Sequence, residues 1–433
     1  MLFVKSDQQL PQDKEEIIKE RDPRKLSAVV DYGLVFVGDL LPYGVLFLLT
    51  VLTGFRFGIQ AAGFWSLCYA YVAIITTLIC GPNLLSLRRR MPSNPSPGAV
   101  IIAGWILRLV AIGSGVALLL IASRIMNTGT DLIPLMSLLF VARFVETSID
   151  GPATGIQYLY NARSYFLLRL TVFLVIIAVV LLGVFGTDSN SGQTALIDVA
   201  TAYLVGACLG FLVTLFATRT LFIPAIVPIK VWAELRGQSR ELAKFVLATV
   251  LFLMASRLHP VIISALRGQE MAGQFAMVQN LFAVLALAST GVAGVFFWSR
   301  NRQARDHLLD GVPWLWLTGA IVGGTFVGMI GAIAINYMYL TPLEGSDLLK
   351  RTAWIICLAT PLILSQAILS NVLVLQKRDT EMLLLAAGNS LLSVLIIWLA
   401  VYRFGLLGAA ASVSISAGFS SAMGIWIVRR KNG

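Results

Sequence analysis

Long runs of apolar residues recur along the whole chain, and they constrain its fold more than any other feature. The 433-residue sequence is 58% hydrophobic and only 13% charged, with a mean hydropathy of +0.83. Soluble globular proteins carry about 25% charged residues. Apolar runs of 18 or more residues predict membrane-spanning helices. The sequence therefore predicts an all-α integral membrane protein with no soluble domain.

Twelve of these runs are predicted to cross the membrane. Their bounds are 28–53, 61–85, 99–123, 131–149, 166–186, 195–217, 243–266, 271–298, 313–338, 351–375, 382–402 and 405–428. The connections between them are short. The longest internal connection, 218–242, separates two nearly equal halves, and its amphipathic stretch 231–242 is expected to lie along the membrane surface.

The expected domain organisation follows from this separation. Residues 1–27 mix acidic and basic side chains and lack the apolar segment of a cleavable signal, so they predict a polar cytoplasmic tail. The segments 28–217 and 243–433 are each expected to form a six-helix lobe, the second with a short cytoplasmic tail, and 218–242 links them. Two such lobes predict a V-shaped transporter.

Basic residues divide unequally between the two sides of these spans. Of the 33 lysines and arginines, twenty-three fall in the tails and in the connections on one side, and six fall on the other side. Positive charge collects on the cytoplasmic side of membrane proteins. Both termini are therefore expected in the cytoplasm of a multi-pass cell (inner) membrane protein. The formal net charge of +11 then reflects topology and not nucleic-acid binding.

A short segment recurs in the two halves. Gly58 to Leu67 returns, altered, as Gly268 to Met277, and each copy opens the second apolar run of its half. Small residues let membrane helices approach closely, so both copies are expected to form equivalent packing corners of the two lobes. Glycine pairs expected to pack in the same way are Gly206 with Gly210, Gly319 with Gly323, and Gly324 with Gly328.

Patterns typical of enzymes and metal sites are absent from the sequence. The four cysteines and two histidines lack the spacing of metal ligands, and no Ser/His/Asp constellation indicates catalysis. No Gly-Lys pair occurs, so the chain has no phosphate-binding loop for ATP. These absences favour a transporter without an ATPase motif, a cofactor or a catalytic residue.

Three motifs, taken in their order and spacing, resemble those of a known superfamily. They are the repeated openings at Gly58 and Gly268, an arginine-bearing helix from Arg257 that runs into the second opening, and the Phe404-Gly-Leu-Leu-Gly-Ala-Ala start of the last span. Together they resemble the polysaccharide (O-antigen-type) flippase branch of the multidrug/oligosaccharidyl-lipid/polysaccharide exporters. The resemblance covers residues 28–428, essentially all the membrane part.

The resemblance implies a flippase that works by alternating access. Its substrate would be a polyprenyl-diphosphate-linked oligosaccharide, moved from the cytoplasmic to the outer leaflet for the export of surface polysaccharide. The head group would enter a cationic cavity between the lobes while the lipid tail stays in the bilayer. The protein would act as a monomer, with polysaccharide polymerase machinery as its partner.

Several charged side chains lie deep inside predicted spans, where charge is costly and indicates function. Arg108, Arg143 and Arg257 lie about 14–21 Å along their helices from the membrane surface, at 1.5 Å per residue. Guanidinium groups match phosphate oxygens bidentately, so these arginines are the predicted cavity residues for a diphosphate. Alternatively, Glu146 neutralises Arg143 from the same helix, and Arg108 reaches back to the surface. Arg169 lies near the end of its span, and its side chain is expected to reach the membrane surface.

Asp39 and His259 are the candidates for ion coupling. Asp39 lies three residues before Pro42, and an acidic membrane residue beside a helix bend can bind Na⁺ or H⁺. The resemblance supports this role, because drug antiporters of the superfamily use an acidic residue on the first helix. An ion pair with Arg108, Arg143 or Arg257 would explain Asp39 as well. His259 precedes Pro260, which is expected to bend the helix, and its alternative role is packing.

Two other functions stay open. The first is a cation-coupled multidrug antiporter of the same fold, although three buried arginines against one aspartate favour an anionic substrate. The second is a membrane polysaccharide polymerase or ligase, an enzyme class that usually needs a large outer loop. The outer loops of this chain are short.

Overall fold

The computed structural model describes residues 25–91, 96–125, 133–159, 162–186, 192–222, 228–282, 314–340, 347–375 and 378–430. Every regular element within these ranges is helical. The helices are α2 (Lys25–Arg90), α3 (Pro97–Ile125), α4 (Ile133–Ser148), α5 (Asp150–Leu159), α6 (Ala162–Gly186), α7 (Gly192–Ala217), α8 (Arg219–Phe222), α9 (Pro228–Arg257), α10 (His259–Arg267), α12 (Trp314–Ile333), the π-helix η4 (Ala334–Leu340), α13 (Asp347–Cys357), α14 (Thr360–Leu375) and α15 (Asp379–Arg429). Residues 269–282 are helical as well. The predicted all-α class is confirmed.

Seven helices of the described part are long and apolar enough to cross a membrane. Two of them, Gly33–Asn83 and Thr380–Arg429, are 51 and 50 residues long, and each contains two predicted spans joined at a non-helical glycine, Gly58 or Gly405. Counted in this way, nine of the twelve predicted spans lie in these seven helices.

The other three predicted spans differ from this pattern for separate reasons. The span 131–149 corresponds to α4, which is only 16 residues long. The span 243–266 is divided between α9 and α10, which separate at Leu258, next to the expected bend at Pro260. The span 271–298 lies partly outside the described residues. The number twelve therefore stays a prediction.

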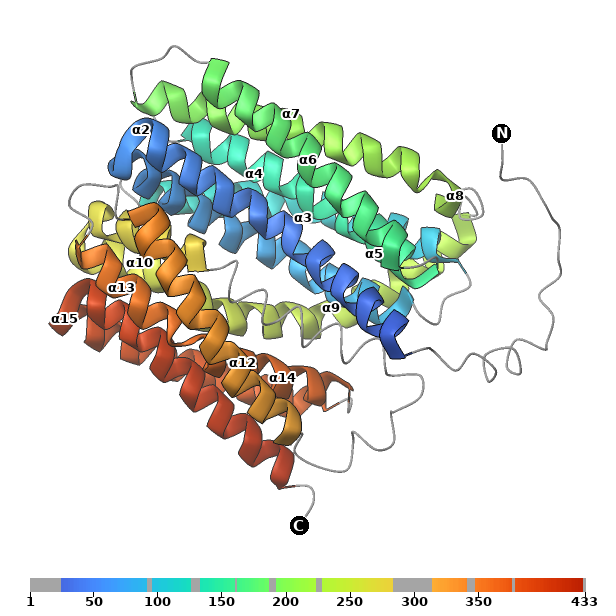
Figure 1. Ribbon diagram of the computed structural model, residues 1–433. Helices are drawn as coiled ribbons and strands as arrows, with labels where there is room; N and C mark the ends of the chain where they lie inside the picture. The colour runs from blue at the N-terminus through green and yellow to red at the C-terminus, as the bar shows by residue number, and fades with distance from the viewer. Residues whose placement is uncertain are drawn as a thin grey trace.

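The helices pack in two groups that α9 connects. Helices α2 to α7 contact one another, and α12 to α15 contact one another. Helix α9 packs against α2 and α3 of the first group and against α15 of the second. Figure 1 shows α9 between the blue-to-green helices and the orange-to-red helices. This arrangement agrees with two lobes, whose exact boundaries stay a prediction.

The repeated segments adopt the same backbone conformation. Gly58 has φ 87° and ψ 173°, and Gly268 has φ 91° and ψ 169°. Residues that carry a Cβ atom rarely adopt such positive φ values, which explains why glycine opens both segments. Five residues further on, Gly63 and Gly273 pack against each other. A Cβ atom added to Gly273 would lie 2.9 Å from the carbonyl carbon and oxygen of Gly63.

Two of the three predicted glycine pairs also mark close helix contacts. A Cβ atom on Gly206 would lie 3.0 Å from the Cα of Ile176, so α7 packs directly on α6. On α12, a Cβ atom on Gly324 would lie 2.7 Å from the Cα of Pro361 in α14. The expectation for Gly319 and Gly323 is wrong within the described residues, because both are exposed and a Cβ atom on either would meet nothing within 4 Å.

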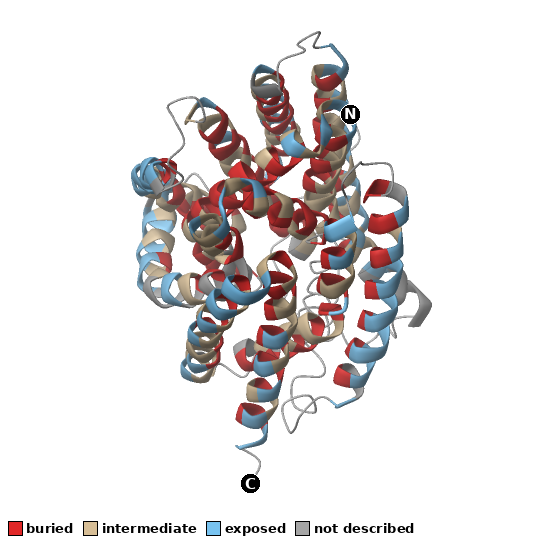
Figure 2. Cartoon of the chain, turned by 90° about the vertical axis from the view of Figure 1, so that its left-hand side faces the viewer, coloured by how far each residue is buried: buried red, intermediate tan, exposed pale blue. Residues whose placement is uncertain are grey.

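Apolar side chains cover the outside of the helices as well as the interior. Figure 2 shows buried residues gathered between the helices and exposed residues on their outer faces. Many of the exposed residues are large and apolar, including Val110 on α3, Leu182 on α6 and Leu391 on α15. A soluble monomer rarely exposes such extensive apolar surface. Contact with lipid acyl chains explains this distribution.

Buried hydroxyl groups of these helices bond to carbonyls of their own helix. Thr50 Oγ1 donates to the Leu46 carbonyl at 2.9 Å, and Thr76 Oγ1 donates to the Val72 carbonyl at 2.9 Å. Polar groups in a membrane must find partners within the protein. These local bonds therefore allow threonine in the core without a partner on another helix.

Candidate functional site

A first polar group joins α2, α5 and α6 in the first half of the chain. We define the Asp39 group as Asp39, Asp150, Tyr165 and Arg169. The Tyr165 hydroxyl donates to Asp39 Oδ1, Arg169 Nε donates to the Tyr165 oxygen at 3.2 Å, and Arg169 Nη2 forms an ion pair with Asp150 at 2.7 Å. Gly38 makes room for this group, because a Cβ atom there would lie 2.8 Å from the Tyr165 ring.

A second polar group joins α4 and α7 beside the first. We define the Glu146 group as Arg143, Glu146 and Tyr203. Arg143 Nη1 forms an ion pair with Glu146 Oε2 at 2.5 Å, and the Tyr203 hydroxyl donates to the same oxygen. The Arg143 guanidinium also lies 6.0 Å from the centre of the Tyr69 ring. Glu146 is only 5% exposed.

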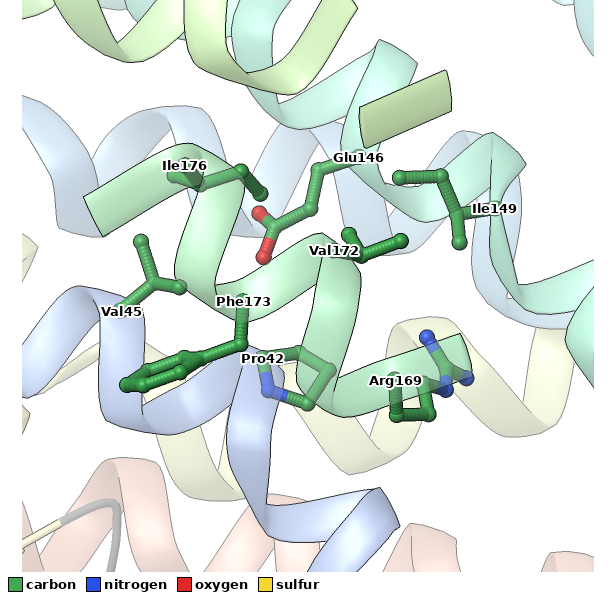
Figure 3. Close-up of a pocket in the computed structure, with 8 residues that line it drawn as sticks. All are labelled: Pro42, Val45, Glu146, Ile149, Arg169, Val172, Phe173 and Ile176. Carbon is green, nitrogen blue, oxygen red and sulfur yellow. The ribbon is translucent and has the colours of Figure 1, made fainter. Parts of the chain in front are cut away.

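The other carboxylate oxygen of Glu146 lies beside a small cavity. Glu146 Oε1 is buried and has no hydrogen-bond partner among the described residues. It faces a cavity of about 10 Å³, which is room for about one water molecule. Figure 3 shows the carboxylate pointing between Val45, Phe173 and Ile176, while the Arg169 guanidinium points away from it. The cavity therefore separates the two polar groups.

Pro42 lies at the wall of this cavity. Proline has no N–H, so the carbonyl four residues earlier, that of Gly38, lacks its helical donor. Gly38 packs against Tyr165 and Arg169. The site thus combines a carboxylate oxygen without a partner among the described residues, a helix carbonyl without its usual donor, and a small cavity between predicted membrane helices.

The two groups together carry more acid than base. Asp39, Glu146 and Asp150 are three carboxyl groups, whereas Arg143 and Arg169 are two guanidinium groups. If all were ionised, the site would carry one net negative charge. An uncompensated charge is costly wherever it is buried among helices. A bound cation or proton would remove the excess, so the arrangement suits cation binding.

Arg108 lies apart from this site, among neutral groups. It is 1% exposed, and it donates from Nε to Asn83 Oδ1 at 2.8 Å and from Nη1 to the Thr147 carbonyl at 2.7 Å. Asn83 Nδ2 donates in turn to Gln238 Oε1 at 3.2 Å. Arg108 therefore ties α3 to α2 and α4 and, through Asn83, to α9. It does not reach back to a surface.

The remaining predicted site residues are placed in three different ways. Arg143 forms the alternative ion pair with Glu146 that its helical spacing indicated. His259 is 2% exposed and stacks on Phe275, with ring centres 5.6 Å apart. Arg257 is the last residue of α9, and its side chain lies outside the described residues. Binding of an anion by Arg108, Arg143 and Arg257 stays a prediction, as does coupling by His259.

Comparison with known proteins was made by sequence and by structure. No protein-family model and no curated protein matches the sequence. A MOP superfamily transporter from Pyrococcus furiosus is 13% identical, with a TM-score of 0.64 over 93% of this chain and 95% of that one. The eukaryotic MATE transporter AtDTX14 is 14% identical, with a TM-score of 0.64 over 93% of this chain and 96% of that one.

An outward-facing multidrug resistance MATE family transporter is also similar, at 14% identity and a TM-score of 0.61 over 93% of this chain and 95% of that one. This chain has the MOP transporter fold. This fold is the one expected from the resemblance of the three sequence motifs. The polysaccharide flippase branch is not singled out, because the similar structures include MATE transporters.

Within this MOP fold, sequence reasoning missed half of the site. Arg169 was expected to reach the membrane surface, and this is wrong, because it is 5% exposed and paired with Asp150. Asp150 follows the end of a predicted span, so depth inside a span does not indicate it as a site residue. One pattern pointed to the group: Tyr165 and Arg169 are four residues apart, so they share a helix face. Their partners on α2 and α5 are visible only in the fold.

Proposed function

We propose that this chain is a cation-coupled exporter that works by alternating access, with the Asp39 and Glu146 groups as its coupling site. The observation that carries this proposal is the balance of three carboxyl groups against two guanidinium groups around a water-sized cavity. A cation or proton that neutralises the excess carboxylate changes the free energy of the site. Such differential binding can drive a two-state transporter.

The geometry suggests how the binding of a cation or proton would change the contacts between helices. Tyr165 and Tyr203 donate to carboxylate oxygens of Asp39 and Glu146. A protonated or cation-bound carboxyl group accepts these bonds less well, so the contacts of α6 with α2 and of α7 with α4 would weaken together. Pro42 removes one helical hydrogen bond from α2 next to the site, which lowers the cost of bending that helix.

The substrate we propose is an organic cation or other amphipathic solute, as for a multidrug antiporter. Two observations support it. The similar structures include multidrug resistance MATE transporters. In addition, Arg143 and Arg169 are neutralised by carboxylates and so offer little attraction to an anionic substrate. The fold by itself is compatible with several substrates, since one similar structure is described as having a pocket of reverse polarity that suggests a different function.

Proteoliposomes test this proposal. Vesicles containing the purified chain should take up ethidium when an H⁺ or Na⁺ gradient is imposed, and protein-free vesicles should not. Asp39→Asn and Glu146→Gln should each lower the initial gradient-driven rate by about tenfold or more. Asp347→Asn is the matched control, because that carboxylate is 93% exposed and belongs to neither group. Ethidium uptake that depends on neither gradient, or whose rate is unchanged by both Asp39→Asn and Glu146→Gln, would contradict the proposal.

Lipid-linked oligosaccharide flipping is the second candidate. One observation favours it: Arg108 Nη2 is buried without a hydrogen-bond partner among the described residues, so this guanidinium could still donate to an anionic oxygen after a rearrangement. In this case the polymerase machinery would be the partner. Vesicles with a fluorescent polyprenyl-diphosphate sugar test it, because flipping exposes the sugar to a membrane-impermeant quencher. Flipping that Arg108→Gln abolishes, without ethidium uptake, would replace the first proposal by the second.

For either function we propose a monomer in the cell (inner) membrane with both termini in the cytoplasm. The support for this orientation is the excess of basic residues on one side of the spans. Cysteine labelling at exposed positions tests this orientation. Arg56→Cys should react with an impermeant reagent added outside cells, and Arg240→Cys should react only after the cells are opened. The reverse labelling pattern would show that the orientation in the membrane is opposite to the one proposed.

A further inference from the structure

A second cavity lies away from the polar groups, between α3 and the first half of α9. It has a volume of about 400 Å³, within the usual range for pockets that bind small molecules. Its lining includes Ile106, Leu107 and Val110 on α3, and Trp232, Arg236 and Ser239 on α9. We call this cavity the α3–α9 groove. Neither the Asp39 group nor the Glu146 group contributes to it.

The α3 wall of the groove is apolar and faces outward. Val110 is 77% exposed, and its neighbour Leu109 is exposed as well. This wall belongs to Pro97–Ile121, one of the helices apolar enough to cross a membrane. Trp232, which is 68% exposed, faces it from α9. An acyl chain of the surrounding bilayer is the ligand that such an outward, apolar groove accepts.

The α9 wall of the groove ends in positive charge. Arg236 is exposed and forms no ion pair with any described residue. Lys230 and Arg240 are exposed on the same helix. By contrast, Glu234, two residues before Arg236, forms an ion pair with Arg90 at 3.3 Å. A guanidinium beside an apolar groove matches a lipid phosphate followed by its acyl chains.

Contacts of α9 outside the groove lining fix its position against α2 and α3. Gln238 is buried and donates from Nε2 to the Val100 carbonyl at 2.9 Å, while its Oε1 accepts from Asn83. The ion pair of Glu234 with Arg90 fixes the preceding turn. Gly237 leaves room for this pair, since a Cβ atom there would lie 2.9 Å from the Arg90 guanidinium carbon. The helix is thus anchored to α2 and α3 independently of a ligand.

We propose that the α3–α9 groove binds an anionic phospholipid, with its phosphate at Arg236 and an acyl chain along Leu107 and Val110. The guanidinium of Arg236, which lines the groove, selects a headgroup with net negative charge over a zwitterionic one. The groove shares no lining residue with the Asp39 group or the Glu146 group, and its apolar wall faces outward. This binding does not depend on which solute the protein transports.

Fluorescence quenching by brominated lipids tests the proposal. The full-length protein is reconstituted in phosphatidylcholine vesicles with increasing fractions of brominated phosphatidylglycerol. Subtraction of the Trp232→Phe signal from the wild-type signal isolates the quenching at the groove. We expect half-maximal quenching of this component at a several-fold lower fraction of brominated phosphatidylglycerol than of brominated phosphatidylcholine.

Two variants sharpen the test. Arg236→Gln should raise the fraction of brominated phosphatidylglycerol needed by several fold, to the value found for phosphatidylcholine. Arg240→Gln is the matched control, because it removes the same charge one turn away without lining the groove, and it should leave the fraction nearly unchanged. Equal quenching by both lipids, quenching by neither, or equal effects of the two arginine substitutions would each overturn the proposal. Size-exclusion profiles confirm that all variants fold.

Discussion

Gly63 and Gly273, one from each copy of the repeated segment, pack backbone against backbone. A Cβ atom on Gly273 would lie 2.9 Å from the Gly63 carbonyl, and one on Gly63 would lie 3.3 Å from the Gly273 carbonyl carbon. The repeat therefore does more than mark equivalent corners of two lobes. Its two copies touch, and their contact joins the halves of the chain at the end predicted to face outward.

Gly273→Ala should destabilise the protein by about 1–3 kcal/mol, the usual cost of overpacking. The added methyl group meets backbone atoms, which cannot move aside as a flexible side chain can. Gly63→Ala should cost less, because its contact is longer. Gly323→Ala on α12 is the control, since a Cβ atom there meets nothing within 4 Å. Thermal unfolding in detergent measures all three, and equal melting temperatures for Gly273→Ala and Gly323→Ala would refute the prediction.

Alanine at Gly58 or Gly268 should be destabilising for a different reason. A Cβ atom would meet nothing within 4 Å at either position, so the cost is purely one of backbone conformation at positive φ. For an L-residue at these φ and ψ values this cost is about 1–3 kcal/mol. Gly113, which is also uncrowded but lies inside α3, should respond with the opposite sign, because alanine is a better helix former by about 1 kcal/mol. The same melting assay decides between these signs.

Tyr339 of η4 forms a second contact between the two halves. Its hydroxyl donates to the Thr50 carbonyl of α2 at 3.0 Å, and its ring meets Phe55 edge-on with centres 5.5 Å apart. Tyr339→Phe should remove about 1 kcal/mol from this contact and leave the ring packing intact. The population with the halves separated at this end should then rise about fivefold.

Spin labels can measure this shift. Arg56→Cys and Arg351→Cys place labels on the two halves at exposed positions, with the exposed Cys208 replaced by serine. Tyr339→Phe should increase the long-distance fraction between the labels. Tyr402→Phe, which changes an exposed tyrosine hydroxyl elsewhere, should not. An unchanged distribution in Tyr339→Phe would show that the hydroxyl does not hold the halves together.

The Arg169–Asp150 pair should behave as a buried ion pair. Replacing Arg169 by methionine leaves Asp150 unpaired and should cost about 3 kcal/mol, the lower end for buried pairs because the Asp150 side chain is 22% exposed. Adding Asp150→Asn should recover part of this loss. Lys350→Ala breaks the exposed pair with Asp347 and should cost under about 1 kcal/mol. Melting temperatures of the single and double variants would reveal the coupling, and strictly additive losses would argue against it.

Much of the architecture could be predicted from the sequence alone. The long apolar runs required helices, because backbone groups in lipid must bond within their own segment. The recurrence of Gly58 and Gly268 predicted equivalent corners, and their nearly equal φ and ψ values confirm it. The order of three motifs indicated the superfamily, and the MOP transporter fold agrees with it. These properties depend on local composition and spacing, which a sequence displays directly.

The charge balance of the site was decided only by tertiary structure. By depth in the sequence, three arginines outweighed one aspartate and indicated an anion. In the fold, Arg108 is bonded to the neutral groups of Asn83 and Thr147, while Glu146 and Asp150 join Asp39. Among the described side chains of the site, acidic groups now outnumber basic ones. A charge in a membrane acts on what lies within a few ångströms, and helices distant in sequence supply those neighbours. Depth along one helix determines that a charge needs a partner, and packing alone determines which partner it has.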